Sequence, residues 1–138
     1  MRARAFTLLE TLVALAVVGV LIGVVGIRYI NAKRTAYLTR LQAELRDLVT
    51  AQEAYYGASG TTSAPRYAET LEQLGFVPHA DVTIEMRGGR TGWSAKATSI
   101  ELPEDTHYCA VYIGEAEPFE PAREEGEISC LPAKRDVL

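Results

Sequence analysis

The sequence predicts an α+β fold in which one long N-terminal helix packs on a small antiparallel β-sheet. Two observations lead to this prediction. No proline occurs between Met1 and Ala64, and the residues from Phe6 to Tyr56 follow a helical pattern. Beyond them, short segments of alternating apolar residues lie between glycine- and proline-rich turns, which is typical of strands in an antiparallel meander.

The first half of the predicted helix is apolar on every side. Residues 11–27 carry no charge, and extending the run back to Phe6 adds only Glu10. A helix needs about 20 apolar residues to cross the hydrocarbon core of a bilayer, whereas the apolar region of a cleaved secretory signal is typically about 7–15 residues long. We therefore expect a membrane-spanning helix. Basic residues on both sides of the run leave its orientation open.

The second half of the helix, residues 28–56, has a single apolar face. Its apolar side chains recur at spacings of three and four residues, with Gln52 at the one polar position in the series. Such a stripe is typical of a helix that covers a sheet. The positions that define it are Leu38, Leu41, Leu45, Leu48 and Tyr55.

Residues 57–138 predict a β-rich head domain. The turn-rich segment 57–65 ends the helix, and a short helix that includes Tyr67, Leu71 and Leu74 stops at Gly75. The expected strands lie at 81–86, 93–97 and 107–113, with a short fourth strand within 126–131. The intervening segment 115–127 is rich in proline and glutamate, and we expect it to be irregular and solvated.

Glu10 is the unusual residue of the apolar run. A charge inside a bilayer costs roughly 2.5–3.5 kcal/mol on insertion scales and usually has a partner. One interpretation is a carboxylate near the helix end that reaches interfacial water. The other is a specific partner: cleavage after Ala5 would create an α-amino group on Phe6, one helical turn away. That amine could pair with Glu10 of its own chain or of a neighbour.

The segment Arg4-Ala5-Phe6-Thr7-Leu8-Leu9-Glu10, followed by the apolar run, resembles the N-terminal signal of type IV pilins and type II secretion pseudopilins. The resemblance implies that a prepilin peptidase cuts between Ala5 and Phe6, that Phe6 is then N-methylated, and that Glu10 serves filament assembly. The family usually has glycine before the cut. This chain has Ala5, the next smallest residue, and we expect cleavage there.

The resemblance also implies how the chain is organised. Residues 1–5 would be a leader, 6–27 the membrane-spanning and filament-core half of the helix, 28–56 its amphipathic half, and 57–138 the head with a C-terminal disulfide loop. In assembled pili of this family the apolar half often loses helicity between a glycine and a proline. Here the flexible positions would be Gly19, Gly23 and Gly26, and no proline is present.

The chemistry-bearing residues of the head are few. Cys109 and Cys130 predict a disulfide in a domain beyond a membrane signal, with two free thiols as the alternative. In pilins such a disulfide often bounds the C-terminal loop. His79 and His107 lack metal-ligand spacing, and the glutamates of 115–127 lack the pattern of a calcium loop. We expect no metal and no cofactor.

Charge and motifs together limit the function. Residues 57–138 hold 14 of the 18 acidic residues, which argues against nucleic-acid binding, and no catalytic motif stands out. The chain is therefore not expected to be an enzyme. The leading hypothesis is a structural subunit that waits in the inner membrane and self-assembles, with pilus or type II secretion machinery, into an extracellular pilus. A periplasmic pseudopilus subunit and a membrane-anchored binding domain with a non-cytoplasmic head are the alternatives. The resemblance allows adhesion, motility, secretion or DNA uptake as the biological role, and the residues favour none of them.

Overall fold

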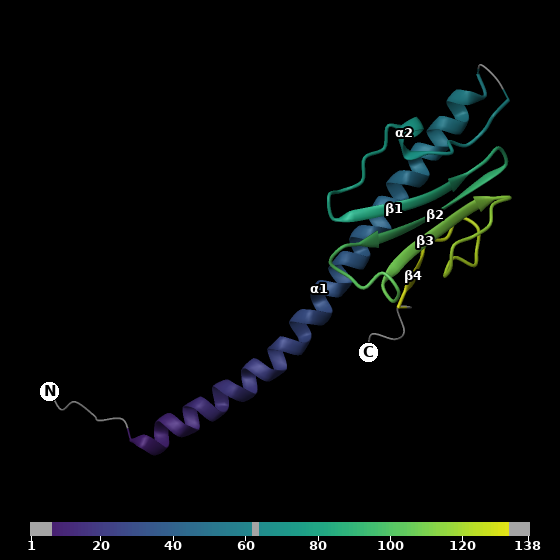
Figure 1. The fold of residues 1–138 in the computed structure, drawn as a ribbon. Coiled ribbons are helices and arrows are strands. Elements are labelled where there is room, and N and C mark those ends of the chain that lie inside the picture. Colours follow the sequence, from purple (N-terminus) through teal and green to yellow (C-terminus); the bar gives the residue numbers. More distant parts are fainter. Residues whose placement is uncertain (1–6, 62–63, 133–138) are drawn as a thin grey trace. The chain divides into compact units, whose positions relative to one another are not determined.

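The computed structural model describes residues 7–61 and 64–132, and the chain divides into two compact units, residues 1–34 and 35–138. The described chain forms a long helix and a four-stranded sheet, which confirms the predicted α+β fold (Figure 1). The elements, in chain order, are α1 (Leu8–Ser59), α2 (Leu71–Leu74), β1 (Val82–Gly88), β2 (Gly92–Ser99), β3 (Tyr108–Gly114) and β4 (Ser129–Leu131).

Helix α1 ends three residues beyond the expected Tyr56. Its last turn is held by the Tyr56 carbonyl, which accepts the Ser59 hydroxyl at 2.9 Å and the Gly60 amide at 3.2 Å. Ser59 Oγ also accepts the amide of Arg66 at 3.0 Å. The serine therefore satisfies a carbonyl at the helix end and fastens the returning chain to it.

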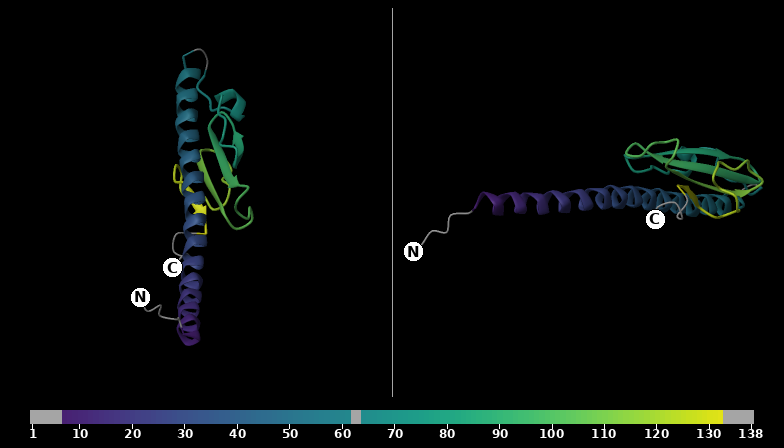
Figure 2. Two further views of the ribbon diagram at one scale, coloured as in Figure 1. Left: turned by 90° about the vertical axis from the view of Figure 1, so that its left-hand side faces the viewer. Right: turned by 90° about the horizontal axis from the view of Figure 1, so that it is seen from below.

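The sheet is an antiparallel meander in the order β1-β2-β3-β4. Within the second unit, the sheet and the part of α1 beyond Thr35 form two layers (Figure 2). The four expected strands are all present, and the fourth is three residues long. The register places Ala95 of β2 between Met86 of β1 and Val111 of β3, so β2 lies inside the sheet.

The core lies between α1 and the sheet. Leu41, Leu45 and Leu48 are fully buried and Leu38 packs against them, which confirms these four positions of the predicted apolar face. Tyr55, the fifth, is half-buried. Opposite the leucines, β2 presents Trp93 beside two small residues, Ala95 and Ala97, and all three are fully buried. Small side chains on a strand let a helix approach closely, and leucines then fill the space without voids.

Gln52, the polar member of the helical series, is also fully buried. Its side-chain amide donates to the Ala68 carbonyl at 3.0 Å, and its carbonyl oxygen accepts the Ala68 amide at 2.9 Å. The same nitrogen lies 3.2 Å from the sulfur of Met86. Gln52 thus pairs with the backbone of Ala68 as a neighbouring strand would, and it holds the loop after α1 against the helix.

The acidic segment 115–127 is irregular, as expected, and its six glutamates are exposed. The expectation that it is simply solvated is wrong in one respect, because it covers the outer face of the sheet. Phe119 and Ala122 are buried against Ala110 of β3, and the Arg87 guanidinium lies 4.1 Å from the centre of the Phe119 ring. A second, smaller core therefore forms on the face away from α1.

Cys109 and Cys130 form the predicted disulfide. The two cysteines are directly opposite each other in the register of β3 and β4. The bridge therefore joins neighbouring strands and closes the segment that carries Phe119. In the chain-entropy model, a loop of this size gives about 3 kcal/mol of stabilisation.

Replacing Gln52 with alanine is expected to destabilise the head by about 2–3 kcal/mol, because both backbone groups of buried Ala68 lose their partners. Urea unfolding of the detergent-solubilised full chain, followed by the fluorescence of buried Trp93, measures the change. Gln42→Ala on the same helix is the matched control. Gln42 donates to the Cys130 sulfur, a weak acceptor, so its loss should be below about 1 kcal/mol. Equal losses in the two variants would contradict the role of Gln52.

Candidate assembly segment

The residues at which cleavage, methylation and assembly are predicted lie in the N-terminal part of the chain. Ala5 and Phe6, the expected cleavage and methylation positions, lie outside the described residues. Glu10, Gly19, Gly23 and Gly26 all lie on α1 in the first unit. Their surroundings in the described chain decide what each of them is free to contact.

Thr7 starts the helix. Its hydroxyl accepts the Glu10 amide at 3.3 Å, and its carbonyl accepts the amides of Glu10 at 3.0 Å and Thr11 at 3.3 Å. This is an N-cap, which satisfies backbone donors that have no partner within the helix. One turn on, the Thr11 hydroxyl donates to the Leu8 carbonyl at 2.8 Å, so this polar group is also satisfied inside the apolar segment.

The Glu10 carboxylate is exposed in the first turn of α1. In a full capping box this carboxylate would reach back to the amide of the capping residue. Within residues 7–61 and 64–132 the Glu10 side chain has no hydrogen bond and no ion pair. The cap is made by the Thr7 hydroxyl and the Glu10 main chain, and the carboxylate is left available for a cation from elsewhere.

Among the described residues of the first unit, the apolar side chains of α1 are exposed. Helix α1 is long and apolar enough to cross a membrane, and none of its most apolar stretch is buried within the chain. The large apolar side chains from Leu8 to Val25, together with Tyr29 and Ile30, are 49–76% exposed. An isolated helix of this kind needs lipid or other helices around it.

The three glycines leave room on this helix. Around Gly19, Gly23 and Gly26, an added methyl group would meet no atom within 4 Å outside the local helix backbone. Gly19 and Gly23 are four residues apart and share a face, where the missing side chains allow another helix to approach closely. All three are helical in this structure, and the predicted loss of helicity on assembly stays a prediction.

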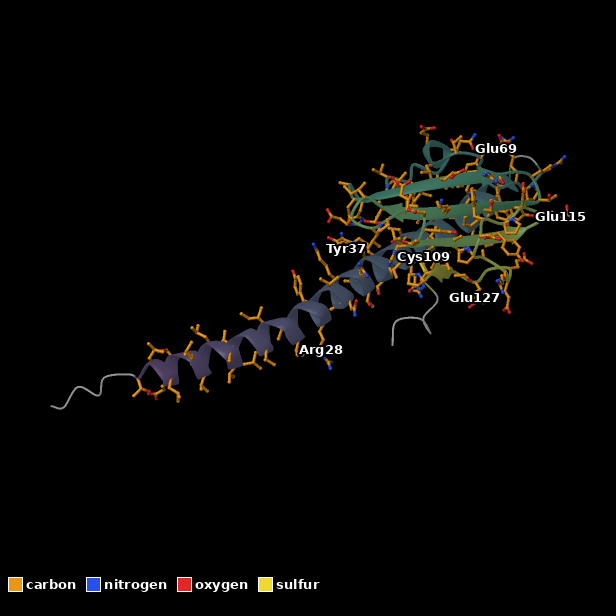
Figure 3. All side chains as sticks on the ribbon, turned by 60° about the horizontal axis from the view of Figure 1, so that its bottom comes forward. Arg28, Tyr37, Glu69, Cys109, Glu115 and Glu127 are labelled. Atoms are coloured by element: carbon orange, nitrogen blue, oxygen red, sulfur yellow. A yellow bond between two sulfur atoms is a disulfide. The ribbon has the colours of Figure 1, made fainter. Side chains whose placement is uncertain are left out.

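Charged and aromatic residues follow the apolar run. Arg28 and Tyr29 are exposed on α1, and the Arg28 side chain extends away from the helix (Figure 3). Long basic chains and tyrosines are favoured at the level of lipid headgroups, where an apolar stem and a polar tip are both accommodated.

Sequence reasoning missed two contacts that fasten the loop before β1 to α1. Arg40 donates to the Asp81 carboxylate at 2.7 Å, and His79 contacts the buried carboxylate of Glu44 through Nδ1. The sequence indicated only that His79 lacks metal-ligand spacing. The spacing of Arg40 and Glu44, one helical turn apart on the side of Leu41 and Leu45, was the available signal.

Comparisons with known proteins agree with the features of the N-terminus. Residues 1–26 match the family model described as the prokaryotic N-terminal methylation motif. The chain is 26% identical over 98 residues to the type IV major pilin protein PilA of Myxococcus xanthus strain DK1622. The match covers 71% of this chain and 39% of the relative, so the chain spans about two fifths of that protein's length. No solved structure matches the chain.

Replacing Thr7 with alanine is expected to loosen the first turn of α1 by about 1 kcal/mol, because the cap hydroxyl is lost. Thr7→Ser keeps the hydroxyl and is the matched control. Amide hydrogen exchange at Glu10 and Thr11, measured by NMR on the full chain in micelles, should quicken several-fold in the alanine variant only. Equal exchange in both variants would show that the cap does not hold this turn.

Proposed function

We propose that this chain, whose N-terminal motif and pilin relative support a place in the type IV pilin family, is a structural subunit of a type IV pilus or pilus-like filament. The precursor would sit in the inner membrane through residues 6–27, lose residues 1–5 to a prepilin peptidase, and be N-methylated at Phe6. It would then self-assemble through α1, with the head outside the cytoplasm. The chain itself would catalyse no reaction.

The observation that carries the proposal is the exposure of the large apolar side chains along the described first half of α1. Keeping one large apolar side chain in water rather than buried costs about 1.5–3 kcal/mol, and more than a dozen are exposed here. The segment must therefore pass directly from lipid to an environment of similar apolarity. Helices of neighbouring subunits supply such an environment in a filament.

Apolar burial cannot by itself favour neighbours over lipid, because lipid tails are as apolar as leucine. Assembly therefore needs a specific polar contact between subunits and close helix packing. The Glu10 carboxylate, which has no partner in the described chain, would make the polar contact with the new α-amino group of Phe6 in a neighbouring subunit. Gly19 and Gly23 would allow the close packing. External machinery would provide the energy to extract the subunit.

Two related functions share much of this support. A type II secretion pseudopilin would use the same N-terminal segment in a periplasmic rod. The disulfide-closed loop of the head leans toward a pilus subunit, whereas the small head and the absence of a proline from the apolar run lean toward a pseudopilin. A membrane-anchored binding domain would explain the apolar helix but would give the free Glu10 carboxylate no role.

Replacing Glu10 with alanine should leave the chain in the membrane but reduce its incorporation into filaments at least tenfold. The reason is that the α-amino group of Phe6 in the neighbouring subunit would lose its carboxylate partner. Immunoblots of membrane and sheared-surface fractions measure both amounts. Glu101→Ala, an exposed carboxylate of the head, is the matched control and should assemble normally. Normal incorporation of the Glu10 variant would overturn the proposed assembly role of Glu10. Absence of the unaltered chain from the sheared-surface fraction would favour the anchored domain.

Mass spectrometry of the native N-terminal peptide tests processing separately. A chain that starts at N-methylated Phe6 is expected in the membrane and in sheared material. Processed chain confined to the membrane and periplasm would identify a pseudopilin. A chain that keeps Met1–Ala5, or one cut after the apolar run, would contradict the pilin function.

A further inference from the structure

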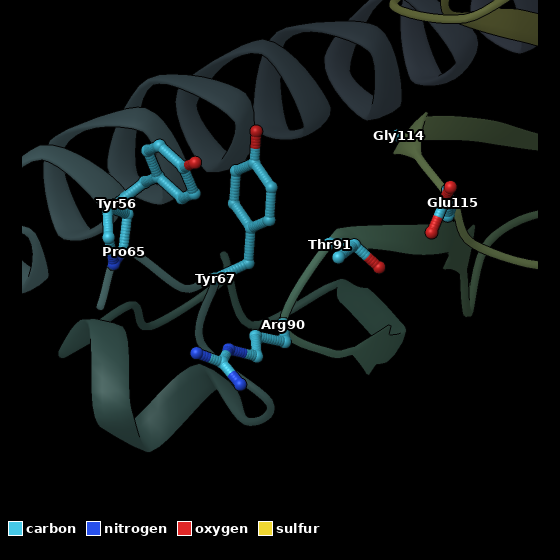
Figure 4. Close-up of a pocket in the computed structure, with 7 residues that line it drawn as sticks. All are labelled: Tyr56, Pro65, Tyr67, Arg90, Thr91, Gly114 and Glu115. Atoms are coloured by element: carbon cyan, nitrogen blue, oxygen red, sulfur yellow. The ribbon is translucent and has the colours of Figure 1, made fainter.

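A hollow of about 390 Å³ lies at the end of the head where α1 finishes (Figure 4). Three separate parts of the second unit line it: the last turns of α1 with the loop that follows, the turn between β1 and β2, and the end of β3. The lining residues are Tyr56, Pro65, Tyr67, Arg90, Thr91, Gly114 and Glu115. Nothing in the filament function uses this hollow.

Two tyrosines form an aromatic wall of the hollow. The rings of Tyr56 and Tyr67 stack with their centres 4.6 Å apart (Figure 4). Burial, and then the nearby Glu53 carboxylate, raise the pKa of the Tyr67 phenol, which therefore stays protonated at neutral pH. Tyr67 and Arg90 also line a second hollow of about 330 Å³, so the two spaces share this pair of side chains.

Three polar side chains of the hollow have no partner in the described chain. Among the described residues, the side chains of Arg90, Thr91 and Glu115 make no hydrogen bond or ion pair, although Arg90 and Glu115 have opposite charges. Each is exposed. The hollow therefore combines an aromatic surface with a free planar donor, a free carboxylate and a free hydroxyl, a set that can orient a ligand.

Glycines hold this end of the head in a geometry that other residues do not allow. A methyl group added at Gly88 would lie 2.0 Å from the Ala68 carbonyl oxygen, and one at Gly92 would lie 2.5 Å from that of Ile113. At Gly114, where φ is +67°, it would lie 2.2 Å from the Thr91 carbonyl oxygen. These close approaches bring the loop of Tyr67 to the turn of Arg90, and Thr91 to Glu115. The hollow is thus preformed by the backbone.

We propose that this hollow binds a neutral, polyhydroxylated ligand, a chain of pyranose sugar units. A sugar ring has an apolar C–H face that packs on an aromatic ring and hydroxyls that both donate and accept. Glu115 would accept from hydroxyls, and Arg90 would donate to them. The two hollows joined by Tyr67 and Arg90 suit a ligand with consecutive units. The proposal does not depend on filament assembly.

The charges around the hollow disfavour anionic polymers and single cations as ligands. Glu53 and Glu125 both act on Tyr67, and Glu115 lies in the lining, so an anionic polymer would meet three carboxylates against Arg90. A single cation would meet the Arg90 guanidinium. A zwitterionic peptide end could use Arg90 and Glu115 at once, and the test below separates it from a sugar.

Saturation-transfer NMR and calorimetry on the full chain in detergent test the proposal. The probes are neutral di- to tetrasaccharides of glucose, mannose, galactose and N-acetylglucosamine, with dipeptides and an anionic oligosaccharide as separate arms. Arg90→Ala and Glu115→Gln should each weaken binding about tenfold, since each removes hydrogen bonds to a charged group. Arg46→Ala and Glu104→Gln, exposed residues outside the hollow, are the matched controls and should bind normally.

Tyr67→Leu and Tyr67→Phe test the aromatic wall. The leucine variant keeps an apolar side chain and should lose binding, whereas phenylalanine keeps the ring and should retain it. Unchanged Trp93 fluorescence would show that the head stays folded in each variant. Saturable binding of a neutral sugar that both pocket substitutions weaken would support the proposal. Binding only of dipeptides or the anionic probe, equal binding in all variants, or no sugar binding at millimolar concentration would overturn it.

Discussion

The contact of Leu41, Leu45 and Leu48 with β2 is the interaction on which the head depends. A four-stranded sheet has two faces to cover, and α1 covers one of them. The other face is covered by Phe119 and its neighbours from the acidic segment. Strand β2 lies inside the sheet and is buried on both sides over most of its length. The disulfide between β3 and β4 closes the segment that provides the outer cover.

Helix α1 meets two different physical demands. Apart from Glu10, its residues from Leu8 to Gly26 are apolar on nearly all sides and exposed in the described chain. Its later turns hide one stripe of leucines and expose their charged side. A single secondary structure satisfies the backbone in both settings, because a helix bonds its own amides and carbonyls. The change in side-chain pattern therefore moves the same backbone from a lipid or helix-packed environment to the surface of a sheet.

Periodicity in the sequence predicted the elements that bury regular faces. The leucine stripe, the alternating strands and the disulfide all follow from spacing and composition, and the structure contains them. Contacts between distant segments were not predictable in this way. Gln52 stands in an apolar series, but only the fold shows that Ala68 is its partner, 16 positions away. Phe119 lies among glutamates, and its burial depends on how the disulfide returns the chain over β3. The hollow at Tyr67 is likewise formed by segments far apart in the sequence, which approach closely at Gly88, Gly92 and Gly114.

The sequence Thr7-Leu8-Leu9-Glu10 has two possible physical origins, and the structure separates them. A threonine followed three residues later by glutamate is a helix-start signal in any protein, because each side chain can bond the other's amide. Here only the first half of that exchange is made: the Thr7 hydroxyl accepts the Glu10 amide, and the Glu10 carboxylate bonds nothing in the described chain. Any residue except proline at position 10 could supply that amide. The local start of the helix therefore accounts for Thr7 but not for a charge inside an apolar run that costs roughly 2.5–3.5 kcal/mol to insert. Contact with interfacial water is one way to offset that cost. The proposed function offers another, because a cationic N-terminus on a neighbouring helix would have the required charge at the required end.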